Sequence, residues 1–187
     1  MEPILQEAAD AVREGALIVF PTDTVYGIGC DPFSSTAVQS LFTAKKRPTG
    51  KTIPLLVDSI TTAHAIADIS PQCEVLLNTF WPGALTVVVP TTVSFPDGII
   101  KNGTIAIRMP DHEDLLELIE NVGGVLAATS ANISGEDALL NYTDAYAQFK
   151  DVAKVILPGV VQTAEPSTII DCTGNTPVVL REGPVHI

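Results

Sequence analysis

The stretch Leu17-Ile18-Val19-Phe20-Pro21-Thr22-Asp23-Thr24-Val25-Tyr26-Gly27-Ile28-Gly29 places a short apolar run directly before a polar turn. The run at 17–20 has the length and composition of a buried strand. The turn supplies two threonine hydroxyls, a carboxylate and two glycines, where backbone can approach a ligand closely. Taken alone, it is explained more simply by hydrogen bonds among its own polar groups. A strand that opens into a polar turn is the first unit of an α/β pattern.

The rest of the chain continues this pattern in both directions. Apolar residues between Ile4 and Val12 recur at helical spacing, and Gly15 follows as a C-terminal cap. Ser34, Ser35 and Thr36 offer N-caps to a helix that ends near residue 45. Further strands are expected at 54–57, 85–89, 104–108, 125–128, 155–157, 168–170 and 178–180, and further helices at 61–67, 71–80, 113–121 and 143–149. Because several strands follow one another without a helix, we expect a twisted, mixed β-sheet flanked by helices.

Composition limits the class of protein. With 187 residues, 46% of them hydrophobic and 17% charged, the chain is expected to form a single α/β domain over 1–187. No apolar stretch approaches the roughly 20 residues that span a bilayer, and no signal-like segment opens the chain, so we expect a cytoplasmic protein without membrane contact. Three widely separated cysteines, Cys30, Cys73 and Cys172, are expected to be reduced and structural. Neither they nor the histidines have metal-chelating spacing, so no tightly bound metal is expected.

Charge points to an anionic ligand. The formal net charge is −12, yet four of the ten basic residues, Lys45, Lys46, Arg47 and Lys51, fall within seven positions. They lie between the expected helix and the apolar run at 54–57, where a rigid scaffold can aim them. The alternative is that they complement the dipole of the helix C-terminus. The overall acidity argues against general nucleic-acid binding.

Polar residues also end other expected strands. Thr129–Gly135 follows a very apolar run, and the ends of buried strands are where α/β folds place ligands; an N-cap and turn is the simpler alternative. Arg108 and Arg181 end two more strands, where a guanidinium needs a carboxylate or phosphate partner. Asp111 and Glu182 are possible internal partners. Cations, hydroxyls and amides without a proton-transfer residue suit phosphoryl or nucleotidyl transfer.

Taken together, these stretches resemble the YrdC-like family of threonylcarbamoyl-AMP synthases. The matching features run in family order over nearly the whole chain. They are Pro21–Gly29, Lys45 and Arg47 followed by Pro54-Leu55, Phe80-Trp81-Pro82-Gly83, Ile107-Arg108-Met109-Pro110, Ser130–Gly135, Pro166-Ser167-Thr168 and Leu180-Arg181-Glu182-Gly183.

The resemblance implies a twisted sheet around a deep central cleft and a reaction in which L-threonine, bicarbonate and ATP give L-threonylcarbamoyladenylate and pyrophosphate. That product serves the N6-threonylcarbamoyladenosine modification of transfer RNA at position 37. By similarity, the threonine contacts are Thr24, Arg108 and Ser167, and the catalytic cations are Lys45 and Arg47. The ATP contacts implied are Lys45, Arg47, Thr104, Ser130, Asn132 and Arg181.

The resemblance also implies Mg²⁺ bound with the nucleotide, and a downstream tRNA threonylcarbamoyl-transferase complex that receives the product. The excess of acidic residues argues against direct tRNA binding. The segment 48–53 is longer than the usual family spacing, which leaves the roles of Lys51 and Asp58 open, as is the question of whether this loop closes on substrate. Two alternatives stand: a paralogue with carbamoyl-adenylate or other nucleotide chemistry, and a non-catalytic nucleotide- or RNA-binding module.

Overall fold

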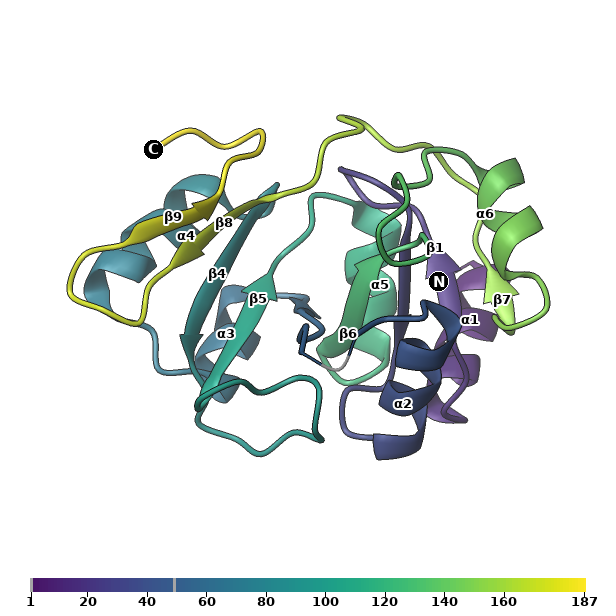
Figure 1. The fold of residues 1–187 in the computed structure, drawn as a ribbon, viewed down its shortest axis with the longest axis horizontal. Helices are drawn as coiled ribbons and strands as arrows, with labels where there is room; N and C mark the ends of the chain where they lie inside the picture. The colour runs from purple at the N-terminus through teal and green to yellow at the C-terminus, as the bar shows by residue number, and fades with distance from the viewer. Residues whose placement is uncertain (1, 49) are drawn as a thin grey trace.

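The computed structural model describes residues 2–48 and 50–187. Over these residues, nine strands form one mixed sheet in the order β7-β1-β2-β6-β3-β5-β4-β8-β9 (Figure 1). The strands are β1 (Ile18–Phe20), β2 (Gly27–Cys30), β3 (Leu55–Val57), β4 (Leu85–Pro90), β5 (Thr104–Arg108), β6 (Val125–Ser130), β7 (Val155–Ile156), β8 (Thr168–Asp171) and β9 (Val178–Arg181). The helices are α1 (Pro3–Arg13), α2 (Ser35–Ala44), α3 (Ile60–Ile66), α4 (Pro71–Phe80), α5 (Glu113–Asn121) and α6 (Tyr142–Phe149).

Every helix and strand expected from the sequence is present, within one or two residues of its expected ends. The structure also has a strand that we did not expect. We expected a turn through Gly29, and β2 instead begins at Gly27 and pairs antiparallel with β1. Its glycines are needed by packing: a Cβ on Gly27 would lie 2.7 Å from the Phe20 ring, and one on Gly29 would lie 2.6 Å from the Ala127 carbonyl oxygen. The glycine backbone, which we expected to approach a ligand closely, therefore closely approaches Phe20 and the Ala127 carbonyl.

Short polar side chains cap the start of four of the described helices, and the sequence analysis had expected such a cap for α2. The Ser34 hydroxyl accepts a hydrogen bond from the Ala37 amide at the start of α2, and the same arrangement opens three other helices. Those caps are Ser59, Ser70 and Asn141. Each cap satisfies an amide that lacks a partner within the helix and so fixes where the helix begins.

Two apolar layers cover the sheet. Helices α1 and α5 pack on one side over Ile18, Phe20 and Leu126, while α2, α3, α4 and α6 border the larger core on the other. In Figure 1, α3 and α4 lie beside β4, and α6 lies beside β7 at the opposite end. The cysteines are free and buried, as expected, and burial with the nearby charge of Asp31 raises the pKa of Cys30 to about 12. That thiol is protonated at neutral pH.

Over residues 2–48 and 50–187, none of the helices combines the length and apolar character needed to cross a membrane.

Candidate functional site

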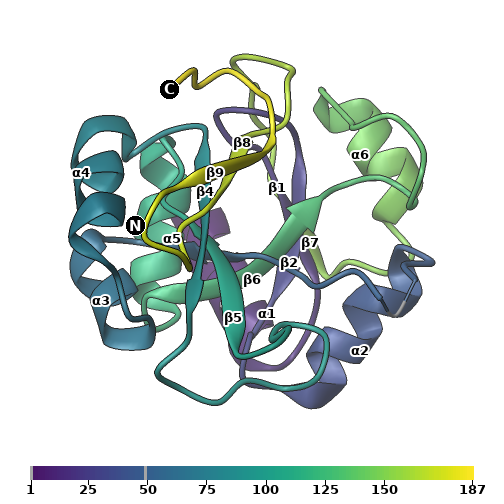
Figure 2. The ribbon, with the colours of Figure 1, turned by 60° about the vertical axis from the view of Figure 1, so that its left-hand side comes forward.

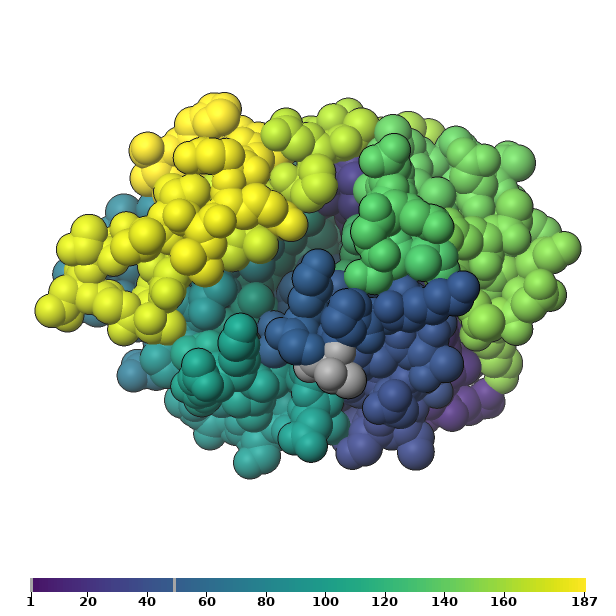
Figure 3. All heavy atoms as spheres, in the orientation of Figure 1, coloured from purple at the N-terminus to yellow at the C-terminus, as the bar shows by residue number. Residues whose placement is uncertain are grey.

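One face of the sheet carries a cavity of about 480 Å³, which we call the central cavity. Paired residues on neighbouring strands point to the same side of a sheet. Leu56 pairs with Arg108, and Val88 pairs with Ala106, and all four line the cavity. The same alternation extends along β4 to Thr86, which pairs with a lining residue of β8. Figure 3 shows the hollow between the yellow C-terminal strands, the green segment after β6 and the blue segment after α2.

The lining of the central cavity is cationic. Among the described residues that line it, four carry a positive charge and none carries a carboxylate. The four are Arg47, Lys51, Arg108 and Arg181. In a chain of net charge −12, this separation of charge makes the cavity the place where an anion is favoured. The anion site expected from the sequence is thus larger than the cluster at 45–51.

Arg108 is held in the cavity wall by three oxygen acceptors. Its Nη2 donates to Asp23 Oδ1 at 2.5 Å, its Nη1 to Thr24 Oγ1 at 2.9 Å and its Nε to the Gly83 carbonyl at 2.9 Å. We had considered Asp111 as the internal partner, and the structure gives Asp23 instead. A guanidinium has five N–H donors, so two remain for a ligand. Burial lowers the pKa of Arg108, against the opposing effect of Asp23, and the group stays charged.

The Trp81-Pro82-Gly83 segment presents the carbonyl that Arg108 uses. Trp81 Nε1 donates to the Leu85 carbonyl at 2.8 Å, and the Gly83 amide donates to the Met109 carbonyl at 2.8 Å. A Cβ on Gly83 would lie 2.6 Å from the Phe80 carbonyl oxygen, so only glycine fits this turn. This motif therefore fixes the arginine and does not itself line the cavity, among the residues described there.

The Thr22–Thr24 turn makes internal hydrogen bonds and also lines the cavity. Thr22 Oγ1 donates to the Val25 carbonyl at 2.7 Å and accepts from the Thr24 and Val25 amides. The two threonine hydroxyls lie 2.9 Å apart. The connection between β7 and β8 crosses above this turn (Figure 2), where the Ala164 amide donates to the Thr24 carbonyl at 3.0 Å. The internal hydrogen bonds expected for this turn are confirmed, and its role toward a ligand stays a prediction.

Ser167, directly before β8, and Arg181, the last residue of β9, line another part of the cavity. Arg181 Nε and Nη2 donate to the Ser167 carbonyl at 3.0 and 2.6 Å, so its partner is not the Glu182 that we had considered. The Ser167 hydroxyl lies 2.8 Å from the Thr86 hydroxyl. Partial burial, and then the charge of Arg108, lower the pKa of Arg181, and both arginines line the cavity. A single anion between them would relieve their repulsion.

The basic cluster divides into residues that line the cavity and residues that do not. Arg47 and Lys51 line it, while Lys46 is exposed and Lys45 is buried. Arg47 Nε donates to the Lys51 carbonyl at 3.2 Å, and its Nη2 donates to the Thr52 carbonyl at 2.6 Å. Burial lowers the pKa of Arg47. This arginine thus holds the far end of the lengthened segment, within which residue 49 lies outside the described residues.

The family model Sua5_yciO_yrdC, described as "Telomere recombination", matches residues 10–183. The chain belongs to the Sua5/YciO/YrdC family. A protein of Mycobacterium tuberculosis is 42% identical over 181 residues, which are 95% of this chain and 83% of that protein. The threonylcarbamoyl-AMP synthase of Aliivibrio fischeri is 35% identical over 185 residues, which are 96% of this chain and 98% of that enzyme.

A solved structure of the Sua5/YciO/YrdC family has the same fold. The crystal structure of Pyrococcus abyssi Sua5 complexed with L-threonine superimposes with a TM-score of 0.90 at 36% sequence identity. The match covers 96% of this chain and 54% of that chain, so this chain spans about half the length of the Pyrococcus protein. The mixed sheet and the α/β class expected from the sequence are those of the family.

Not all positions that the family resemblance singled out reach the cavity in the same way. Ser130 lines it, whereas Asn132 is buried beside it and donates from Nδ2 to the Glu136 carbonyl at 2.7 Å. Thr104 shares its face of β5 with Ala106 and Arg108 but is not among the described lining residues, and its hydroxyl donates to the Lys101 carbonyl at 2.7 Å.

The structure shows the surroundings of the two residues whose roles the sequence left open. Lys51 lines the cavity, while Asp58 accepts hydrogen bonds from the hydroxyls of Ser59 and Thr62 at the start of α3. Thr86, which the sequence analysis missed, is a buried lining residue. The clue was its place as a lone hydroxyl within the apolar run Leu85–Val89.

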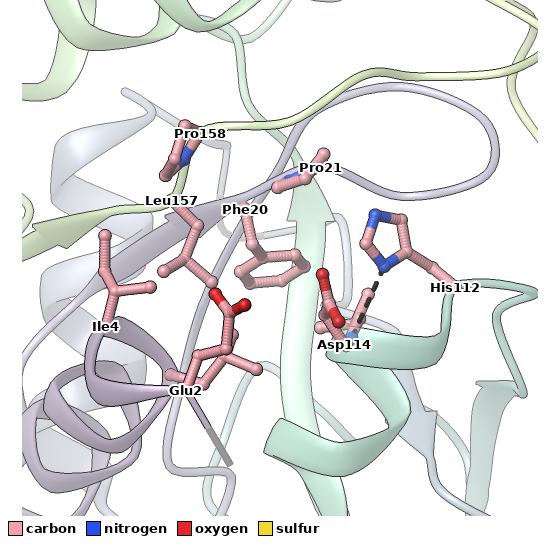
Figure 4. A pocket seen from close by; sticks show the side chains of 10 residues that line it. Glu2, Ile4, Phe20, Pro21, His112, Asp114, Leu157 and Pro158 are labelled. Carbon is pink, nitrogen blue, oxygen red and sulfur yellow. Dashed lines mark hydrogen bonds between the residues drawn. The ribbon is translucent and has the colours of Figure 1, made fainter.

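A second hollow, of about 70 Å³, lies between the N-terminal ends of α1 and α5 (Figure 4). Glu2, Asp114 and His112 stand at its rim, and Phe20 and Leu157 lie against its wall. Its size and its carboxylates do not suit a nucleotide. Over the described residues, no three His, Cys, Asp or Glu side chains are grouped so that they could hold a metal ion.

Proposed function

We propose that this chain is a threonylcarbamoyl-AMP synthase, which condenses L-threonine, bicarbonate and ATP to L-threonylcarbamoyladenylate and pyrophosphate. The observation that carries the proposal is the cationic, carboxylate-free lining of the central cavity in a chain of this family. The reaction brings a carboxylate, a carbamate and a triphosphate together, and their mutual repulsion must be offset by fixed positive charge. Arg47, Lys51, Arg108 and Arg181, which all line the cavity, supply that charge.

The threonine substrate is assigned to the wall formed by Arg108, Thr24 and Ser167. The two free N–H donors of Arg108 suit a carboxylate, which takes two parallel hydrogen bonds from a guanidinium. The hydroxyls of Thr24 and Ser167 would then contact the polar groups at the other end of the amino acid. Because Asp23 and Gly83 hold the guanidinium, the carboxylate is received without reorganisation of the site.

The nucleotide is assigned to the rest of the cavity, and Arg181 lies at the boundary because its guanidinium donates to Ser167. Arg47 would bind phosphate oxygens, and Ser130, Asn132 and Arg181 belong to the same subsite, together with Thr104 at its edge. The described lining residues include no carboxylate, the usual protein ligand of Mg²⁺, so the ion is expected to enter on the triphosphate oxygens and to reduce their charge there.

The chemistry needs placement more than proton transfer by a side chain. The neutral threonine amine and bicarbonate give a carbamate and water. A carbamate oxygen then forms a bond to the α-phosphorus of ATP, the bond from that phosphorus to the bridging oxygen breaks, and pyrophosphate leaves with the electron pair. Holding the two anions in line can provide much of the rate. This explains a site that has cations and hydroxyls but no histidine among its described lining residues.

The proposal extends to what lies around the reaction. The product is a reactive mixed anhydride, which a tRNA threonylcarbamoyl-transferase complex would take up for modification of adenosine 37. A net charge of −12 argues against direct binding of tRNA by this chain. A cytoplasmic location, where ATP and transfer RNA are available, belongs to the same proposal.

Product identification tests the proposal. The purified chain is incubated with MgATP, L-threonine and ¹³C-bicarbonate, and the products are separated and identified by their masses in mass spectrometry. We expect threonylcarbamoyl-AMP that carries one ¹³C atom. When L-serine or glycine replaces threonine at the same concentration, we expect no labelled carbamoyl-adenylate of that amino acid. Formation of a labelled carbamoyl-adenylate without the amino acid would favour the paralogue, and tight ATP binding without any product would favour the binding module.

A further inference from the structure

Lys45 is buried, and its ammonium group faces protein atoms. The residue is 1% exposed. Its Nζ donates to the Asn132 carbonyl at 2.6 Å, to Asn132 Oδ1 at 3.3 Å and to the Ser130 carbonyl. These three acceptors match the three N–H donors of an ammonium group. In this arrangement Lys45 has no donor left for a phosphate oxygen.

The acceptors belong to residues 130–134, which we call the β6 turn. The Ser130 hydroxyl donates to Asn132 Oδ1 at 2.6 Å. The Ser134 amide donates to the carbonyl of Lys45 itself at 2.9 Å. Main chain and side chain of Lys45 therefore both bind this turn, and they join the C-terminal end of α2 to the end of β6.

The residues next to Lys45 have a different setting. Lys46 has a positive φ of 49°, in the left-handed region, so the chain changes direction between Lys45 and Arg47. Arg47 lines the central cavity, whereas Lys45 is not among the described lining residues. The two cations of the Lys-x-Arg pattern thus point to different places, one to the β6 turn and one to the ligand.

We propose that Lys45 is a positioning residue, which holds the β6 turn at the edge of the nucleotide subsite without touching the nucleotide. The inference rests on the proposed function, because that function assigns Ser130 and Asn132 to ATP. A cation is suited to this position, since a neutral apolar side chain would leave three buried oxygens without their donor. The family resemblance implied instead that Lys45 contacts ATP.

Hydrogen exchange tests the contact independently of any activity. Lys45→Met removes the ammonium group and keeps an unbranched side chain, and Lys46→Met is the matched control on the exposed neighbour. We expect the amides of Asn132 and Ser134 to exchange at least tenfold faster in Lys45→Met than in the unchanged protein or in Lys46→Met. Equal protection of these two amides in all three proteins would overturn the proposal.

Equilibrium binding of MgATP tests the link to the ligand. Lys45→Met is expected to weaken binding about tenfold or more, as when buried acceptors lose a charged donor. Lys45→Arg keeps the charge but cannot place three donors on the same oxygens, so we expect a loss of similar size. Restoration of ATP affinity by Lys45→Arg would show that charge at the phosphates matters and would overturn the positioning role.

A double-mutant cycle provides a second readout. If Lys45 acts by placing Ser130 and Asn132, Lys45→Met should cause little further loss of ATP affinity in a protein that already carries Ser130→Ala and Asn132→Ala. Arg47→Ala with Lys45→Met should instead give losses that multiply. Losses that multiply when Lys45→Met is added to the Ser130 and Asn132 changes would contradict the proposal.

The positioning role of Lys45 and the proposed function can be refuted separately. Faster exchange of the β6 turn in a chain that makes no threonylcarbamoyl-AMP would support the contact and refute the proposed function. Synthase activity together with an unchanged turn in Lys45→Met would support the function and refute the positioning role.

Discussion

Arg108 and Asp23 form a buried ion pair, with 2.5 Å between Nη2 and Oδ1, that joins the last residue of β5 to the turn after β1. The pair unites two motifs that lie 85 residues apart in the chain. Together with the bonds to Thr24 and Gly83, it leaves the guanidinium two free donors. If threonine binds here as proposed, the donors that would receive its carboxylate are held in place by the protein itself.

Removal of the Asp23 charge should affect threonine binding and stability together. In Asp23→Asn, the amide holds Arg108 more weakly and leaves its buried charge uncompensated. We expect the free energy of unfolding to fall by about 1–3 kcal/mol, as measured by denaturant unfolding, and the KM for threonine to rise about tenfold or more. Asp58→Asn is the control, because Asp58 binds hydroxyls at the start of α3 and is not among the described lining residues. The same rise in KM in both variants would contradict this role of Asp23.

Arg47→Ala should abolish most adenylate formation while the fold survives. Among the described residues, its guanidinium donates to the loop carbonyls of Lys51 and Thr52, and it lines the cavity where phosphate is expected. Loss of one preorganised donor to developing charge lowers kcat/KM by about a hundredfold. The measurement is steady-state turnover, with circular dichroism as the test of folding. Arg13→Ala is the control, because this arginine lies on the exposed face of α1. Unchanged turnover in Arg47→Ala would remove this cation from the mechanism.

Ser167→Ala should weaken threonine more than ATP. The hydroxyl lies 2.8 Å from that of Thr86, on the wall assigned to the amino acid. We expect the KM for threonine to rise about three- to tenfold, the usual effect of one lost hydrogen bond, with little change for ATP. Thr86→Val, which removes the neighbouring hydroxyl, should act in the same direction. Equal weakening of the two substrates would show that the division of the cavity is wrong.

Gly183→Ala should destabilise the wall that carries Ser167. A Cβ at this position would lie 2.5 Å from the Pro166 carbonyl oxygen and 2.6 Å from the Thr168 amide nitrogen, both backbone atoms. Such overpacking costs about 1–3 kcal/mol, which a thermal unfolding curve would report as a lower Tm. Gly174→Ala is the matched control, since a Cβ there would come no nearer than 4.0 Å to a non-neighbouring atom. Equal Tm values for the two variants would contradict the packing argument.

The titration of Lys45 should be visible in stability and in ATP binding. Burial, and then the charge of Arg47, lower the pKa of Lys45 from 10.5 to about 8. Between these two pH values the unfolded chain holds a proton that the folded chain has released, so the contribution of Lys45 to the free energy of unfolding rises with pH. ATP binding should weaken above pH 8 as the ammonium group is lost.

Lys45→Met provides the comparison for this pH dependence. The difference in free energy of unfolding between this variant and the unchanged protein should vary between pH 8 and 10.5, and Lys46→Met should show no such variation. A difference that is constant across this range would mean that Lys45 keeps its ordinary pKa in the folded chain.

Much of the fold could be predicted because each element has a local cause. Short apolar runs predicted the strands, apolar residues at helical spacing predicted α1, and serine caps predicted the start of α2. Strand β2 was not predicted because its glycines are required by tertiary packing. Gly27 is required by the Phe20 ring and Gly29 by the Ala127 carbonyl, and both of these lie on other strands. A strand sequence of Gly-Ile-Gly-Cys has little strand propensity of its own.

The site shows the same limit. Motif resemblance brought Thr24, Arg108 and Ser167 together, and the structure gathers them in one cavity. It did not indicate that Arg108 pairs with Asp23 and not with Asp111, which is nearer in the sequence. It also did not indicate that the Lys45 ammonium group binds the β6 turn. Both outcomes depend on strand register and burial, which a one-dimensional pattern does not contain.

Pyrophosphate release from ATP by the purified chain tests the central claim most directly, with L-threonine and bicarbonate each present or omitted. Our account predicts release only when both are present, because the carbamate they form is the group that attacks the α-phosphorus. Release that proceeds at the same rate without threonine, or no release under any of the four conditions despite ATP binding, would contradict it.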